Sequence, residues 1–232
     1  MFLRVLEIFD SIQGEGHWTG IPMTFIRLAG CNAPELGLEC LRWCDTRESW
    51  DQEGGVDMEV GDVILRVRLP RVCLTGGEPL LQKEAVIPLA REARGLGMQV
   101  HIETNGTLPP PSPRGSTLVA PATSDGRLFD WVTVSPKPPD YVIAPGWIGI
   151  ADELKLIVDD QLTKDVVERL AADHPGAMVS IQPVWDAGVV SGNRLGLEPV
   201  PDPVAAKRAV KMVMDHPEWR LSLQMHKVLG IK

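Results

Sequence analysis

Several features are scarce in this sequence, and each scarcity excludes a class of protein. Four cysteines occur in 232 residues, too few for the disulfide framework of a small secreted domain. Basic residues form no run of four, and the formal net charge is −8, so binding to a phosphate backbone is not expected. The most apolar stretch, at 142–151, is too short to span a bilayer. The first ten residues alternate and include acids, unlike a signal peptide. We expect a cytoplasmic protein that binds neither nucleic acid nor membrane.

Hydrophobic and charged residues are present in ordinary amounts, 44% and 23%. A chain of this length buries roughly 70% of the surface that its unfolded form exposes. No disulfide or structural metal is therefore needed for folding alone. We expect one α/β domain that spans residues 1–232. Cysteines in a reducing compartment then point to a metal or redox site.

Short apolar runs bounded by glycine, proline and aspartate predict strands at 3–9, 22–29, 72–74, 98–103, 131–134, 154–158, 178–182 and 219–224. Helices are predicted at 82–96, 163–173 and 202–215, with a weaker candidate at 59–68. Residues 32–39 and 108–127 are predicted to be irregular. Alternating strands and helices indicate a mainly parallel sheet. In such sheets the functional loops gather at the carboxyl ends of the strands.

The first motif with chemical meaning is a loop with three cysteines. Cys31, Cys40 and Cys44 follow the predicted strand 22–29, with eight residues in the first gap and three in the second. Three thiolates can bind three irons of a 4Fe–4S cube and leave the fourth iron open. Zinc is the alternative, with Cys73 as a fourth ligand. The spacing alone does not decide between the two.

A second motif follows the predicted strand 72–74, where Thr75 leads into Gly76, Gly77, Glu78 and Pro79. Two glycines let a ligand approach the backbone, and a carboxylate can bind an ammonium group. Such a segment alone could be a plain turn. It comes about thirty residues after the cysteine loop, and the combination is far more specific than either part. It favours the iron–sulfur interpretation.

The two motifs together resemble the radical S-adenosylmethionine (SAM) superfamily, whose fold is a partial or full β/α barrel. The resemblance implies a partial (β/α) barrel with mainly parallel strands. It also implies that Cys31, Cys40 and Cys44 hold a 4Fe–4S cluster whose open iron binds SAM. Gly76, Gly77 and Glu78 would contact SAM.

Further motifs narrow the resemblance to the 7-carboxy-7-deazaguanine synthase family, and they occur in family order along the whole chain. They lie at 11–16, 25–32, 43–46, 103–107, 135–137, 182–183 and 221–227. The implied activity is a radical SAM lyase reaction in 7-deazapurine (queuosine-type) biosynthesis. It converts 6-carboxy-5,6,7,8-tetrahydropterin to 7-carboxy-7-deazaguanine, with ring contraction and loss of ammonia.

The resemblance also implies a role for individual residues. The substrate would be bound by Gln13, Glu15, Arg27 and His226. An arginine within an apolar strand needs an anionic partner, and the substrate carboxylate or a protein carboxylate would serve. Thr46 would be a Mg²⁺ ligand. Further SAM contacts would come from Thr104, Asn105, Ser135, Lys137 and Gln182.

The cysteine spacing departs from the common Cys-x3-Cys-x2-Cys pattern of the superfamily. The longer first gap is tolerated within the synthase family, whereas the extra residue between Cys40 and Cys44 is less usual. Two other functions fit parts of the sequence: a radical SAM activase of a glycyl-radical partner, and a non-catalytic zinc-binding module. From the family we expect a homodimer and an electron donor such as flavodoxin or ferredoxin.

Overall fold

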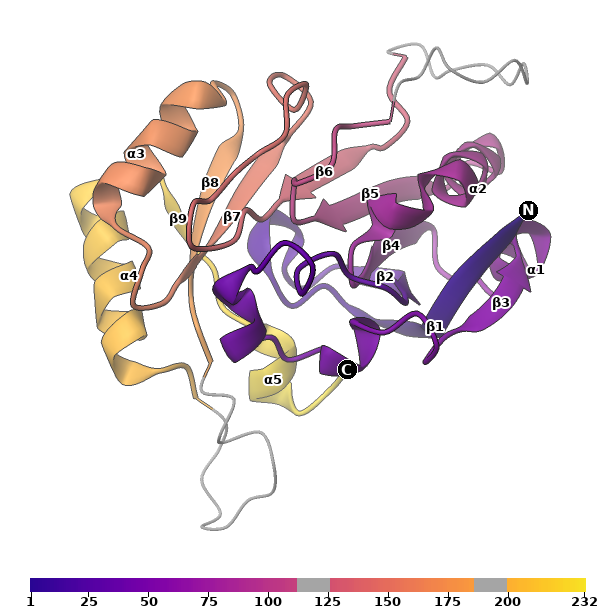
Figure 1. The fold of residues 1–232 in the computed structure, drawn as a ribbon, viewed down its shortest axis with the longest axis horizontal. Coiled ribbons are helices and arrows are strands. Elements are labelled where there is room, and N and C mark those ends of the chain that lie inside the picture. Colours follow the sequence, from indigo (N-terminus) through magenta and orange to yellow (C-terminus); the bar gives the residue numbers. More distant parts are fainter. Residues whose placement is uncertain (112–125, 186–199) are drawn as a thin grey trace.

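The structure is a computed structural model that describes residues 1–111, 126–185 and 200–232. One nine-stranded sheet runs through it in the order β3-β1-β2-β4-β5-β6-β7-β8-β9 (Figure 1). The strands are β1 (Phe2–Ile12), β2 (Pro22–Leu28), β3 (Val56–Glu59), β4 (Arg71–Gly76), β5 (Gln99–Thr104), β6 (Trp131–Val134), β7 (Glu153–Val158), β8 (Met178–Pro183) and β9 (Arg220–Leu221).

The sheet is mainly parallel, as the sequence predicts. Every neighbouring pair from β2 to β9 is parallel. Only β1 is antiparallel, to both β2 and β3, because a short loop of residues 13–21 connects β1 directly to β2. The edge strands β3 and β9 do not pair with each other. The sheet is therefore an open, partial barrel.

The predicted helices at 82–96, 163–173 and 202–215 are all present. The helices are α1 (Val60–Ile64), α2 (Lys83–Gly95), α3 (Lys164–Asp173), α4 (Pro203–Asp215) and α5 (Met225–Leu229), with 3-10 turns η1 (Gly16–Trp18), η2 (Glu39–Arg42), η3 (Arg47–Ser49) and η4 (Pro79–Gln82). Side chains cap two of the α-helices: Asp202 Oδ1 accepts from Ala205 N at 2.7 Å, and Thr163 Oγ1 accepts from Val166 N. Such caps satisfy amides that the helix itself leaves unpaired.

Two predicted elements differ from the structure. The weak helix at 59–68 is shorter, because Glu59 belongs to the edge strand β3 and the helix ends at Ile64. The strand at 219–224 contains only the two residues of β9, and the following segment forms the unpredicted helix α5. Residues 32–38 contain no helix or strand, as predicted. Of the predicted irregular segment 108–127, residues 112–125 lie outside the described residues.

The sheet separates an apolar face from a polar one, and β7 shows the division clearly. All six of its residues are buried. Leu154, Leu156 and Val158 belong to the main hydrophobic cluster, whereas Glu153 and Lys155 alternate with them and point to the other face. Figure 1 shows α3 and α4 packed beside β7–β9, and α1 and α2 at the opposite end of the sheet. In the part of the chain that the structure describes, no helix is both long and apolar enough to cross a membrane.

Candidate active site

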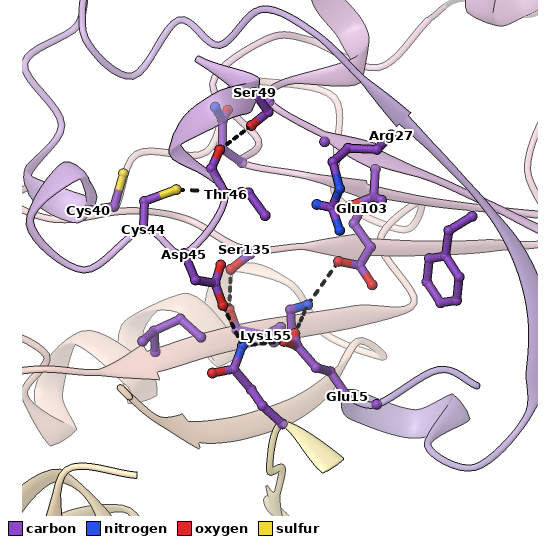
Figure 2. A pocket seen from close by; sticks show the side chains of 18 of the residues that line it. Glu15, Arg27, Cys40, Cys44, Asp45, Thr46, Ser49, Glu103, Ser135 and Lys155 are labelled. Carbon is purple, nitrogen blue, oxygen red and sulfur yellow. Dashed lines mark hydrogen bonds and ion pairs between the residues drawn. The ribbon is translucent and has the colours of Figure 1, made fainter. Parts of the chain in front are cut away.

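A cavity of about 240 Å³ opens among the loops that follow the strands. It is lined by all of the residues that the sequence assigns to cluster, SAM, Mg²⁺ or substrate, with the exception of Glu78. Figure 2 shows two ends of this cavity: Cys40, Cys44 and Thr46 lie on one side, and Glu15, Glu103 and Lys155 on the other. The structure therefore brings together residues that are far apart in the sequence.

The unusual gap between Cys40 and Cys44 forms one helical turn. Cys44 N donates to Cys40 O at 2.9 Å, and the turn continues from η2. Residues four apart in a helical turn lie on the same face. The extra residue, which is unusual for the superfamily, therefore places the two thiols side by side at the cavity.

Tryptophans anchor this cysteine loop. Trp50 O accepts from Cys31 N at 3.2 Å, and the indole Nε1 of Trp50 donates to Cys44 Sγ at 3.2 Å. Trp43 Nε1 donates to Asp159 Oδ2 at 3.0 Å. Backbone and side-chain bonds thus hold both ends of the loop against the body of the protein.

Cys73 does not join the three thiols as the fourth ligand of a zinc site. Cys73, the fourth zinc ligand that the sequence allows, is fully buried in a cluster with Met23 and Phe25 and takes no part in the cavity lining. Burial raises the pKa of the Cys40 thiol to about 11, so binding of metal there must displace a proton.

Gly76 and Gly77 are required by the packing of the backbone. A Cβ on Gly76, where φ is +125°, would lie 2.3 Å from Leu28 O, and one on Gly77 would lie 2.0 Å from Gly30 O. The close approach that the sequence predicts for a ligand is thus already made by β2 and the residues after it. Both glycines still line the cavity.

Glu78 lies behind the cavity wall and is fully buried. Its carboxylate accepts from Leu80 N at 3.0 Å, from Thr104 Oγ1 at 2.8 Å and from Asn105 N at 2.8 Å. Burial raises the pKa of Glu78, although these donors act against the shift. In this geometry the carboxylate holds the loop after β5 in place, and the residues of that loop face the cavity.

Other residues predicted to contact SAM are linked to each other. Lys137 Nζ donates to Ser135 Oγ at 2.7 Å, and Ser135 Oγ donates to Lys155 O at 2.8 Å. Burial lowers the pKa of Lys137, whose ammonium also lies 5.5 Å from the centre of the Trp43 ring. Gln182 Oε1 accepts from Ser222 Oγ at 2.7 Å. Their cofactor roles stay predictions.

The far end of the cavity contains a group of opposite charges in which Lys155 is buried and the two acids are half-buried. Lys155 Nζ binds Glu15 Oε2 and also Glu103 Oε2, the latter at 3.0 Å. Gln13 Nε2 donates to Glu103 Oε1 at 2.9 Å. Burial opposes ionisation of Glu15, but the ammonium of Lys155 holds the pKa of Glu15 far below its usual range. Hydrogen-bond acceptors therefore concentrate at this end.

Arg27 on β2 has the protein partner that its burial requires. Its Nε donates to Glu7 Oε1 at 2.9 Å, and its guanidinium carbon lies 5.7 Å from the centre of the Phe9 ring. Figure 2 shows the guanidinium directed toward the cavity. The contact with Glu7 uses Nε, so the terminal nitrogens can face a carboxylate in the cavity.

The C-terminal segment forms one wall of the cavity. Met225 N donates to Gly14 O at 2.9 Å, and Gln224 Nε2 donates to Glu15 Oε1 at 2.7 Å. Lys227 Nζ lies 2.5 Å from Asp45 Oδ2, next to Thr46. Burial lowers the pKa of His226. The tail thus joins the first loop to the cysteine loop.

Comparison with known proteins gives a consistent result. No family model matches the chain. The 7-carboxy-7-deazaguanine synthase of Bacteroides thetaiotaomicron is 37% identical over 100% of both chains. That of Synechocystis sp. is 31% identical over 98% of this chain and 93% of the relative. The chain belongs to the 7-carboxy-7-deazaguanine synthase family. The crystal structure of QueE from Escherichia coli is also similar, with a TM-score of 0.70, 25% identity and coverage of 97% and 95%.

Membership of the 7-carboxy-7-deazaguanine synthase family decides against the glycyl-radical activase and the zinc-binding module. The structure adds Lys155 to the site residues and links Glu103 and Gln224, which lie in the motifs at 103–107 and 221–227, to the acid-rich end of the cavity. A signal for Lys155 was present, because a lysine within an apolar strand needs a buried partner as much as Arg27 does. The motif at 221–227 includes Gln224 but does not predict its contact with Glu15, because that contact depends on the fold of the tail.

Proposed function

We propose that this protein converts 6-carboxy-5,6,7,8-tetrahydropterin to 7-carboxy-7-deazaguanine and ammonia, as a radical SAM lyase in 7-deazapurine (queuosine-type) biosynthesis. The observation that carries the proposal is that one cavity contains three thiols at one end and a carboxylate-rich group beside Arg27 at the other. Relatives of this name match the full length of the chain.

Cys31, Cys40 and Cys44 would hold a 4Fe–4S cluster, and SAM would lie between the cluster and the substrate. When bound, the cluster and SAM supply the radical that removes hydrogen from the substrate. The chain itself binds and orients the substrate and excludes water from the cavity. Glu15 accepts from the ring N–H groups, Arg27 binds the substrate carboxylate, and the segment with His226 covers the cavity.

We also propose Mg²⁺ as a further cofactor, with Thr46 as a protein ligand. Thr46 Oγ1 lines the cavity 3.6 Å from Cys44 Sγ. One hydroxyl suffices only when water and substrate oxygens complete the octahedron, which is common for Mg²⁺. The Thr46→Ala variant should need a higher Mg²⁺ concentration for half-maximal activity, and Thr46→Ser should restore the wild-type requirement. An unchanged requirement in Thr46→Ala would reject the ligand.

The activity is tested by anaerobic incubation of reconstituted protein with SAM, a reductant and the carboxylated pterin. Substrate and product differ by ammonia alone, so we expect ammonia and deazapurine in equal amounts. Formation of 5′-deoxyadenosine, the product of reductive SAM cleavage, without deazapurine would support the radical chemistry and reject the substrate. A homodimer, a flavodoxin or ferredoxin as reductant, and a cytoplasmic location stay predictions, and gel filtration with the holoenzyme tests the first.

A further inference from the structure

Lys155 occupies a position in the site that no part of the proposed function uses. It projects from β7, a strand whose six residues are all buried, and its side chain is 8% exposed. Its ammonium binds Glu15, from the loop after β1, and Glu103, from the carboxyl end of β5. A single nitrogen thus joins two carboxylates from separate parts of the fold, as Figure 2 shows.

In the part of the chain that the structure describes, the neighbours of this group supply hydrogen bonds but no second cation in an ion pair with either acid. Gln224 Nε2 donates to Glu15 Oε1 at 2.7 Å, and Gln13 Nε2 donates to Glu103 Oε1 at 2.9 Å. Among the described residues, Lys155 is the cation that ion-pairs with both acids. One ammonium and two carboxylates leave a net negative charge at this end of the cavity.

The protonation of such a pair decides what it can bind. Two buried carboxylates at close range do not both ionise without a cation, and they share a proton instead. A protonated carboxyl is a donor at one oxygen, whereas an ionised one only accepts. The pyrimidine edge of a pterin presents donors at its ring N–H and its 2-amino group. A donor in the site facing those groups would leave buried hydrogen-bonding groups unpaired, which is costly.

We propose that Lys155 is a specificity-determining, positioning residue, which keeps Glu15 and Glu103 as paired acceptors at a fixed spacing for the N–H edge of the pterin ring. This inference rests on the proposed function. In this role Lys155 acts through the two acids and does not itself contact the reacting atoms. A purely structural ion pair would stabilise the barrel interior without affecting which protonation state of the site binds substrate.

The test compares the anaerobic dissociation constant of the carboxylated pterin in wild type and in Lys155→Met, measured across the neutral and mildly alkaline range. In the variant the two acids share a proton, so we expect weaker binding that declines further as pH falls, by about ten-fold per pH unit below the pKa of the pair. Wild type should lack this added ionisation. SAM affinity should stay within about two-fold.

Other charged or titratable groups face the pair and set the limits of the pH range. They are His226, Lys137, Arg27 and Cys73. Lys155 also lowers the pKa of His226, so its removal shifts that imidazole as well. The double variant Lys155→Met/Glu103→Gln keeps His226, so an ionisation present in Lys155→Met and absent from the double variant belongs to the two acids. Lys211→Met, which removes an exposed lysine paired with Asp215 on α4, is the matched control and should behave as wild type.

A second variant keeps the inference testable if Lys155→Met folds poorly. Lys155→Met/Glu103→Gln removes one of the two acids together with the ammonium, so no shared proton is expected. Its pterin affinity should be low but free of the added pH dependence. Lys155→Arg, which keeps a cation, should recover part of the affinity.

The outcomes separate the inference from the proposed function. If wild type neither binds nor converts the pterin, the proposed function fails. If wild type binds it, and Lys155→Met shows the same pH profile as wild type, the inference about Lys155 is wrong while the proposed function stands. Equal pH dependence in the single and double variants would also overturn the inference.

Discussion

The imidazole of His226 packs directly against Gly14. A Cβ on Gly14 would lie 2.2 Å from His226 Nδ1, and the backbone of the two segments is joined by the bond from Met225 N to Gly14 O. The glycine in the first loop is therefore required by contact with the tail, more than 200 residues later in the chain. By sequence this loop and the tail are separate segments with predicted substrate contacts, whereas in the structure they form one unit.

Replacement of Gly14 tests this unit. Gly14→Ala should displace His226 and weaken pterin binding by about ten-fold or more, the loss expected from one buried hydrogen bond to substrate. SAM binding should be retained, because the SAM-side residues are on other strands. Gly95→Ala in α2 is the control, since its Cβ would meet nothing within 4 Å, and it should be neutral or stabilising by up to about 1 kcal/mol. Unchanged pterin affinity in Gly14→Ala would contradict the contact.

The four cysteines should divide into two classes. Cys31→Ala, Cys40→Ala and Cys44→Ala should each lose the iron–sulfur cluster and all turnover. Cys73→Ala should keep both, because Cys73 is fully buried beside Met23 and Phe25, and should lose only about 1 kcal/mol of stability from the smaller side chain. Iron and sulfide analysis of the anaerobically reconstituted proteins provides the measurement. A Cys73→Ala protein without iron, or a Cys40→Ala protein with the iron and sulfide content of wild type, would reject the assignment of the cluster ligands.

The indole of Trp50 should tune the cluster. Its N–H donates to Cys44 Sγ at 3.2 Å, and hydrogen bonds to cluster sulfurs stabilise the reduced state. Trp50→Phe should therefore shift the midpoint potential to a more negative value in a redox titration. Trp43→Phe is a matched control, because that indole donates to Asp159 and not to sulfur. Equal potentials in Trp50→Phe and wild type would show that the bond has no such effect.

His101 should make the fold sensitive to acid. Burial, with Arg71 nearby, lowers its pKa to about 4, below the usual value near 6.5, so the folded state disfavours the charged imidazole. Stability from this group is complete above the unfolded-state pKa and declines as pH falls toward the folded-state value. Between about pH 8 and about pH 5 the loss amounts to about 2 kcal/mol.

Urea unfolding of wild type and His101→Phe at both pH values measures this contribution. The variant keeps a ring beside Trp18, which contacts His101 at a centroid distance of 4.9 Å, but it has no ionisation. Its free energy of unfolding should fall less between the two pH values than that of wild type, by the amount given above. Parallel losses in the two proteins would assign the acid sensitivity to other groups.

The sequence predicts the parallel strands β2 and β4–β8 well because they are apolar runs that are mostly buried. The edge strand β9 is only two residues long, and both are exposed. The sequence misses β3, a short edge strand with the polar pattern Val-Asp-Met-Glu, because pairing with β1 and not hydrophobicity makes it a strand. The helix α5 is missed for a similar reason. Five residues are too few for a stable isolated helix, and contacts of the adjoining tail residues with Gly14 and Asp45 position the segment.

The site shows the same limit. Motifs identify the residues at strand ends, and the cavity confirms that these residues lie together. Spacing along the chain does not reveal that Cys40 and Cys44 share a helical turn. Nor does it reveal that Glu78 lies behind the cavity wall and accepts a hydrogen bond from the backbone of Asn105. The role of Lys155 depends on the meeting of the interior of β7 with the loop after β1 and the carboxyl end of β5. Such a meeting follows from the curvature of the sheet, and local sequence does not encode it.

The wall formed by residues 222–226 has a consequence for synthesis of the protein on the ribosome. A nascent chain can pair β1 to β8 before this segment emerges, because those strands do not include it. The first loop, however, finds its partners Ser222, Gln224 and Met225 only after that segment has been synthesised. The acid-rich end of the cavity is therefore completed later than the sheet that carries it.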